Sequence, residues 1–78
     1  MDRKITGENH FQVSATNFAV SPSTTGYTLM YSADGINFTA WEEKTPANET
    51  LVVSGAVNGM YYYLSGNGSE VQITWEGN

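Results

Sequence analysis

Apolar and polar residues alternate most clearly near the end of the chain. Residues 70–76 place Val71, Ile73 and Trp75 on one parity and polar residues on the other. Because successive side chains of a strand point to opposite faces, this pattern predicts a half-buried β-strand. The preceding residues 60–64 are rich in tyrosine, which favours strands, and a Gly- and Ser-rich stretch separates the two runs. We therefore predict a C-terminal β-hairpin.

A second hairpin is predicted in the middle of the chain. Residues 26–32 and 36–41 are two alternating runs, and Asp34 and Gly35 lie between them. An Asp-Gly pair in this position favours a type I′ turn, because the turn needs positive φ angles that glycine adopts at little cost. The next apolar run, residues 50–54, predicts one further strand.

The N-terminal third changes phase. Phe11 and Val13 share one parity, whereas Phe18 and Val20 take the other, and a bulge or short turn near residues 16–17 would reconcile them. No stretch has convincing helical periodicity. The chain therefore holds six or seven short strands at regular spacing, which favours a β-sandwich or a small barrel.

The length of the chain suits one domain with one core, since it has 78 residues of which 40% are hydrophobic. A fold of this size buries only about 60% of its unfolded surface, and small scaffolds usually add disulfides, a metal or a partner subunit. The chain has no cysteine, and its single histidine, His10, and scattered carboxylates form no evident metal cage. We therefore expect assembly with other chains and no metal or other cofactor.

The first residues differ from the rest of the chain. Residues 1–8 show no alternation and hold two of the three basic residues, Arg3 and Lys4. We interpret them as an N-terminal arm that reaches a neighbouring subunit, and residues 9–78 as a single β-sandwich domain. The net charge of −5 argues against nucleic-acid binding, whose affinity comes largely from basic residues that neutralise phosphates.

Targeting and membrane segments are not evident in the sequence. No apolar stretch of signal-peptide length follows the first residues, and no run approaches the ~20 apolar residues of a membrane helix. We expect a protein made in a cytoplasm that makes no membrane contact. The lack of cysteine fits a reducing compartment.

Two segments resemble fibronectin type III and immunoglobulin-like domains. Residues 27–35 are similar to the "Y-x-V-x-Y-S-x-D-G" strand and turn of that class, and residues 51–64 are similar to its "V-x-G-L-x-P-G-x-x-Y-x-V" corner. The resemblance implies that Tyr62 is the corner tyrosine and that Leu64 is the next core residue. The expected fold is all-β, a small six- to seven-stranded immunoglobulin-like β-sandwich.

A second resemblance concerns composition. The chain is short, acidic, free of cysteine and rich in Gly, Ser, Thr, Asn and Tyr. In this it is similar to small virion proteins of tailed bacteriophages, particularly head auxiliary or decoration proteins. The resemblance implies many copies on a capsid lattice and a location in the virion.

Catalytic chemistry finds little support in the sequence. His10 lies next to Phe11, and no G-x-S-x-G context accompanies it, so a nucleophilic triad is not indicated. Glu42 and Glu43 are adjacent at a predicted strand end, where carboxylates commonly solubilise a sheet edge. We therefore expect that the protein is not an enzyme.

Aromatic residues are the stronger binding candidates. Tyr and Trp are enriched at protein interfaces and also form sugar-stacking platforms. Trp75 shares the parity of Val71 and Ile73 and is assigned to the core, whereas the family alignment turns Tyr61 and Tyr63 outward. The predicted partner interface comprises Arg3, Lys4, Met30, Trp41, Tyr61 and Tyr63.

These observations predict a non-enzymatic structural virion protein, a capsid decoration subunit on the outer surface of a phage head. Its expected partners are capsid protein subunits and copies of itself. The alternative is a carbohydrate-binding or adhesive β-sandwich module that contacts a glycan. A third interpretation, an inhibitor or anti-host protein, conflicts with no residue of the sequence.

Overall fold

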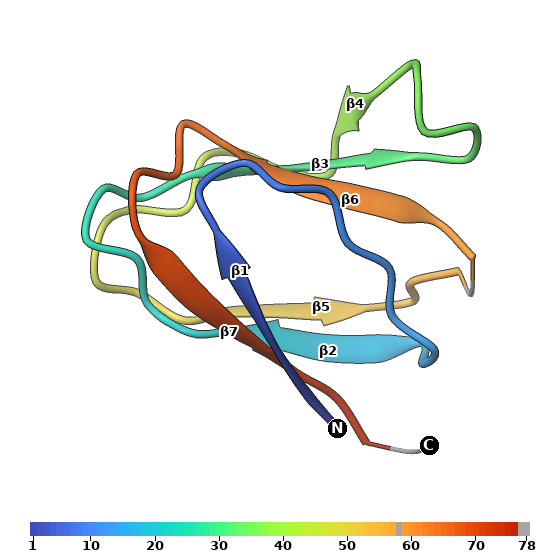
Figure 1. The fold of residues 1–78 in the computed structure, drawn as a ribbon, viewed down its shortest axis with the longest axis horizontal. Helices are drawn as coiled ribbons and strands as arrows, with labels where there is room; N and C mark the ends of the chain where they lie inside the picture. The colour runs from blue at the N-terminus through green and yellow to red at the C-terminus, as the bar shows by residue number, and fades with distance from the viewer. Residues whose placement is uncertain (58, 77–78) are drawn as a thin grey trace.

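The computed structural model describes residues 1–57 and 59–76, and within this part of the chain it contains β-strands and no helix. The strands form two layers that face each other, with β3 and β6 in one and β2, β5 and β7 in the other (Figure 1). The prediction of a small all-β sandwich of six or seven strands is confirmed. The strands are β1 (Asp2–Thr6), β2 (Asn17–Val20), β3 (Thr28–Ser32), β4 (Thr39–Ala40), β5 (Leu51–Ser54), β6 (Tyr61–Ser65) and β7 (Glu70–Thr74).

The strand order is β1-β7-β2-β5 in the four-stranded sheet and β4-β3-β6 in the three-stranded sheet, and all pairs are antiparallel. Alternate residues of both sheets point into the space between them and form one core. The buried apolar residues are Ile5, Phe11, Val13, Phe18, Val20, Tyr27, Leu29, Val53, Ala56, Tyr62, Leu64, Val71, Ile73 and Trp75.

The predicted C-terminal hairpin is wrong, because β6 and β7 lie in different sheets. The place beside β6 is taken by Phe11, whose main chain exchanges two hydrogen bonds of 2.9 Å with Tyr62. Alternation had correctly identified the buried face of both strands, but it carries no information on which strand lies alongside. In immunoglobulin constant domains the last two strands share a sheet, so this strand order differs from that arrangement.

The connection between β6 and β7 crosses the sandwich with the help of a buried polar cluster. Asn67 is 5% exposed, and its carboxamide oxygen accepts a hydrogen bond of 2.7 Å from the Ser23 hydroxyl. The Asn67 amide group donates to the main-chain oxygens of Gly7 and Ser69. These bonds tie three loops together at one end of the sandwich and give the buried side chains of Ser23 and Asn67 hydrogen-bond partners.

The middle hairpin forms, but the predicted two-residue type I′ turn is wrong. Met30 pairs with Ala40 across a longer loop. One carboxylate oxygen of Asp34 accepts hydrogen bonds from the Ser32 hydroxyl and from two main-chain N–H groups, those of residues 36 and 37. The Ser32 hydroxyl and these N–H groups hold the pKa of Asp34 well below its usual range. The aspartate thus organises the loop through its side chain rather than through a tight turn.

The N-terminal residues form an edge strand, which alternation did not predict. β1 pairs with β7 from Asp2 opposite Thr74 to Thr6 opposite Glu70, and only Ile5 of this strand is buried. The assignment of residues 1–8 to a partner-binding arm stays a prediction. The phase change of the next segment is confirmed, because the chain bends at residues 14–16 before β2 begins.

Candidate interaction surface

The outer face of the three-stranded sheet carries three of the predicted interface residues. Met30 lies opposite Tyr63 in the β3–β6 ladder, and both are half-buried, whereas the neighbouring Leu29 and Leu64 pair on the core side. Tyr61 follows the same parity as Tyr63. β6 therefore turns alternate tyrosines outward, and its register with β3 places Met30 beside them.

Two residues that the sequence analysis did not assign to this face complete it. The ring of Tyr63 stacks on His10 at a centroid distance of 5.3 Å and contacts Phe38 edge-to-face at 4.9 Å. His10 and Phe38 also contact each other, at 4.9 Å. We call this surface the aromatic face; it comprises His10, Met30, Phe38, Tyr61 and Tyr63.

The local sequence pattern gave little indication that His10 and Phe38 lie on the aromatic face. His10 precedes buried Phe11, so a strand at this position would turn His10 outward, but its neighbour β6 could be known only from the topology. Phe38 lies outside the two-residue strand β4 and reaches Tyr63 because the long loop returns it to the sheet. Both contacts are therefore products of tertiary structure.

Trp41 does not join the aromatic face. Its ring contacts Tyr31 edge-to-face at 5.2 Å, and both side chains pack against the core. The Trp41 main-chain N–H donates to the carbonyl of Leu29 at 2.8 Å, which fixes the segment after β4 along β3. The structure thus separates Trp41 from Met30, Tyr61 and Tyr63.

The two basic residues of β1 point in different directions, because they are consecutive in a strand. Arg3 lies opposite Ile73 and lines a shallow hollow of about 160 Å³ together with His10, Gln12 and Tyr61. Arg3 is thereby placed at the margin of the aromatic face. Lys4 lies opposite Gln72 and does not line this hollow.

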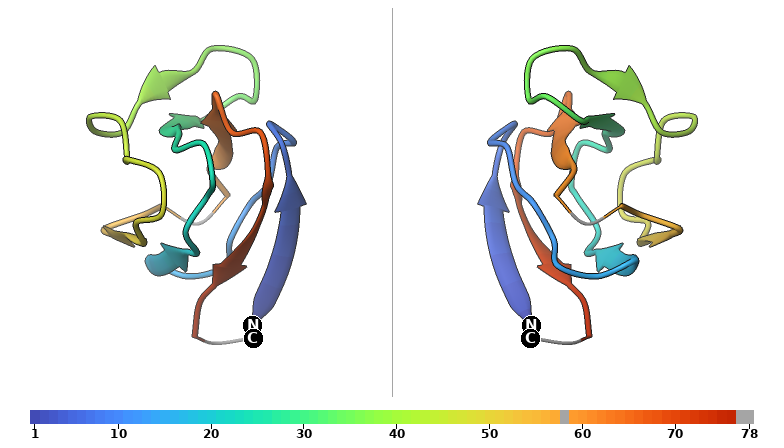
Figure 2. Two further views of the ribbon diagram at one scale, coloured as in Figure 1. Left: turned by 90° about the vertical axis from the view of Figure 1, so that its left-hand side faces the viewer. Right: turned by 90° about the vertical axis from the view of Figure 1, so that its right-hand side faces the viewer.

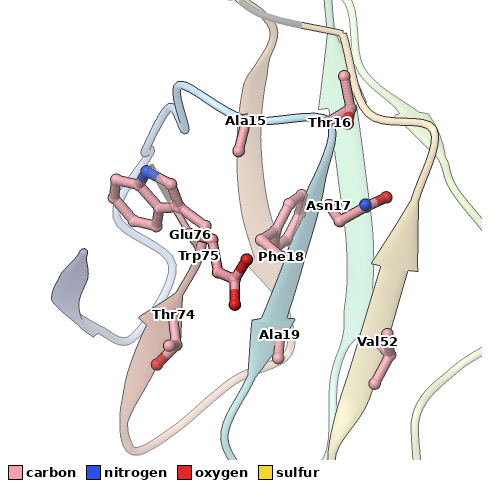
Figure 3. A pocket seen from close by; sticks show the side chains of 9 residues that line it. All are labelled: Ala15, Thr16, Asn17, Phe18, Ala19, Val52, Thr74, Trp75 and Glu76. Carbon is pink, nitrogen blue, oxygen red and sulfur yellow. The ribbon is translucent and has the colours of Figure 1, made fainter. Parts of the chain in front are cut away.

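The outer face of the four-stranded sheet is different in kind. Ala19 pairs with both Val52 and Thr74, and these side chains border an open groove of about 470 Å³. Figure 3 shows that the small side chains of Ala15 and Ala19 leave this space, with Val52 on one side and Trp75 on the other. The groove is therefore open, and its lining mixes apolar side chains, among them Phe18 and Trp75, with polar ones such as Asn17 and Glu76.

Burial changes the pKa of two core tyrosines. Tyr27 is fully buried, its hydroxyl has no hydrogen-bond partner among the described residues, and burial raises its pKa to about 12. Burial also raises the pKa of Tyr62, an effect that the nearby main chain of Val57 partly offsets. Neither hydroxyl is accessible to a substrate.

Among residues 1–57 and 59–76, no group of three or more His, Cys, Asp or Glu residues is placed to hold a metal ion. In the same part of the chain, no helix has the length and apolar character needed to cross a membrane.

Comparison of the chain with protein-family models, curated proteins and solved structures finds no match. Fold and surface together define a class, a small antiparallel β-sandwich with a half-buried aromatic face.

Proposed function

We propose that the protein is a non-enzymatic binding module that docks on a protein partner through its aromatic face. The observation that carries this proposal is the contact of Tyr63 with both His10 and Phe38 on the outer side of the sheet, where His10 is exposed and the other two rings are half-buried. Aromatic residues and methionine are enriched at protein interfaces. Because the three rings already hold one another in place, binding costs little further side-chain entropy.

The partner that fits this proposal best is the shell of a virus particle. The chain is small, acidic and free of cysteine, and it is similar in composition to head decoration proteins of tailed phages. The proposal also includes a relationship to immunoglobulin-like domains, which residues 27–35 and 51–64 resemble in sequence. The mechanism is passive: the module binds assembled capsid subunits, so it favours the assembled state, and repetition over the lattice multiplies the effect.

A carbohydrate-binding or adhesive module is the second candidate. One side of the Tyr61 ring faces Gly35, where a Cβ atom would lie 3.5 Å from the ring. Tyr61 also lines the hollow that holds Arg3, His10 and Gln12. An aromatic ring beside several hydrogen-bonding groups is the arrangement that sugar recognition uses.

The test is co-purification of the chain with particles of the virus whose genome carries its gene. The purified chain is added to particles stripped of it, and the mixture is separated on a density gradient. We expect the unmodified chain to travel with the particles and a Phe38→Ser, Tyr63→Ser double variant to stay at the top. Val57→Ser, at an apolar residue 58% exposed, is the control and should bind normally. Equal binding by all three proteins overturns the proposal, and binding to a glycan array but not to particles selects the second candidate.

A further inference from the structure

The edges of the two sheets are protected to different degrees. An exposed edge strand can pair with another chain, and natural proteins prevent this with charges, short strands or covering segments. β1 carries Asp2, Arg3 and Lys4, and β4 consists only of Thr39–Ala40. The edge of β6 is covered by Phe11. These three edges each use one of the known protective devices.

β5 is the edge strand without such protection. Leu51–Ser54 carries no charge, and the side chain of Val52 is 70% exposed. β5 is the last strand of the four-stranded sheet, and among the described strands it pairs with β2 alone (Figure 2). Among the described residues, the main chain of residues 51–54 makes no hydrogen bond with a loop or an isolated bridge residue. One side of this strand is therefore free to pair.

The surface beside the start of β5 is acidic. Glu42, Glu43 and Glu49 are exposed and border one open hollow of about 540 Å³ together with Leu51. Lys44 is the only basic residue among those that line it. A chain that pairs with β5 therefore meets three carboxylates at one end of the new ladder.

We propose that β5 accepts an extended segment of a partner protein by strand addition. The segment places an apolar residue beside Val52 and a lysine or arginine at the end that faces Glu42, Glu43 and Glu49. Main-chain hydrogen bonds supply affinity in this binding mode, and alternate side chains supply specificity. This surface is separate from the aromatic face and does not depend on the function proposed for it.

A second copy of the chain fits this edge less well. β5 contains no lysine or arginine, so pairing of two β5 strands leaves the three glutamates without basic partners. If the β1 strand of a second copy continued the antiparallel order with Ile5 opposite Leu51, then Glu8 would approach Glu49. Charge complementarity thus favours a basic segment from a different protein.

The test uses a synthetic heptapeptide that alternates threonine and valine and ends in two lysines, with a counterpart that ends in two glutamates. Fluorescence anisotropy measures binding of each labelled peptide to the full chain. We expect the lysine peptide to bind about tenfold more tightly than the glutamate peptide, since charge complementarity sets specificity. Hydrogen exchange should slow in residues 51–54 when the lysine peptide is added.

Val52→Glu distinguishes strand pairing from simple attraction of charges. Although it adds a negative charge, we expect it to weaken binding of the lysine peptide about fivefold, because a charge beside the new strand opposes pairing. Ile36→Glu, at a residue 79% exposed in the loop before β4, is the control and should change binding little. If Val52→Glu unfolds, Val52→Thr replaces it as the test variant, because threonine keeps the β-branched shape of valine.

Three results overturn the proposal. One is the absence of binding by the lysine peptide, and another is an equal effect of the substitutions at Val52 and Ile36. The third is self-association of the unmodified chain, measured by sedimentation and abolished by Val52→Glu. This result would make a second copy the occupant of this edge.

Discussion

The two sheets of this sandwich carry different kinds of side chain. The three-stranded sheet is aromatic on both sides, with Tyr62 buried in the core and Tyr61 and Tyr63 on its outer face. The four-stranded sheet turns mainly aliphatic residues inward, such as Val20 and Ile73 beside Phe18, and its outer face carries Ala19, Val52 and Thr74. The comparison teaches that the core needs only apolar residues of suitable size, whereas the outer face of the three-stranded sheet gathers several rings in mutual contact.

The largest effect on the free energy of unfolding is expected when an aromatic ring is removed from the core. Tyr62 is fully buried and its ring contacts Phe11 at 5.6 Å and Phe18 at 5.2 Å. Tyr62→Ala should lower the free energy of unfolding by about 4 kcal/mol, measured by urea denaturation, because it leaves a large cavity. Ile73→Val in the aliphatic sheet should cost only about 1 kcal/mol. Equal costs would contradict the expectation that the aromatic ring leaves the larger cavity.

A second comparison uses two glycines with similar backbone conformation. Gly26, just before β3, has φ +72°, and a Cβ atom there would lie 2.7 Å from the carbonyl oxygen of Thr45. Gly55, just after β5, has φ +79° and open space around it. We expect Gly26→Ala to cost about 3 kcal/mol and Gly55→Ala about 1 kcal/mol, since only the first adds a main-chain clash to the conformational strain. Thermal melts of both variants check the difference, and a Gly55→Ala variant as unstable as Gly26→Ala would refute it.

Alkaline pH should weaken the protein through Tyr27. Its pKa is raised from 10 to about 12 in the folded state, so its contribution is present below pH 10 and is lost as the pH rises toward 12. Unfolding at a series of pH values should show a loss of about 2 kcal/mol over this window.

Tyr27→Phe is the matched control for this pH dependence. It removes a buried hydroxyl that lacks a hydrogen-bond partner, so stability at pH 7 should stay equal or rise by up to about 1 kcal/mol. The variant should lose less stability than the parent between pH 10 and 12. An identical alkaline profile in both proteins would assign the effect to other groups.

The smallest effects concern the outer faces. Tyr63→Ser removes the two ring contacts of the aromatic face and should cost about 1 kcal/mol. Val52→Ser on the opposite sheet should change stability by less than about 0.5 kcal/mol, since this side chain is mostly exposed. Chemical denaturation resolves the two values, and a Val52→Ser cost that equals that of Tyr63→Ser would show that the faces do not differ.

Much of the strand content follows from the sequence, because alternation reports burial directly. Val71 and Ile73 in β7 and Leu64 in β6 point inward as predicted. β1 escaped prediction, since Ile5 is its single buried residue and its place in the sheet depends on β7, nearly the whole chain away. The pairing of β6 also depends on a distant partner, Phe11, and no local pattern encodes such a choice.

The same limits apply to the candidate surface. The resemblance to immunoglobulin-like domains implied that Tyr61 and Tyr63 point outward, and Met30 lies off the face of the strand that holds Leu29. Trp41 was grouped with them because of its chemistry, but its contact with Tyr31 draws it toward the core. The interface role of these residues, and of Arg3 and Lys4, stays a prediction.

The pairing of β1 with β7 also has a consequence for how the chain reaches its native state. This ladder joins Asp2 to Thr74, so the four-stranded sheet stays incomplete until segments far apart in the sequence have met. Such distant pairings raise the contact order and place folding in the range of milliseconds to seconds. The β2–β5 ladder lies within residues 17–54, so this pair needs no segment from either end of the chain. We therefore expect the strands of the four-stranded sheet to assemble in steps, with β1 held in place last.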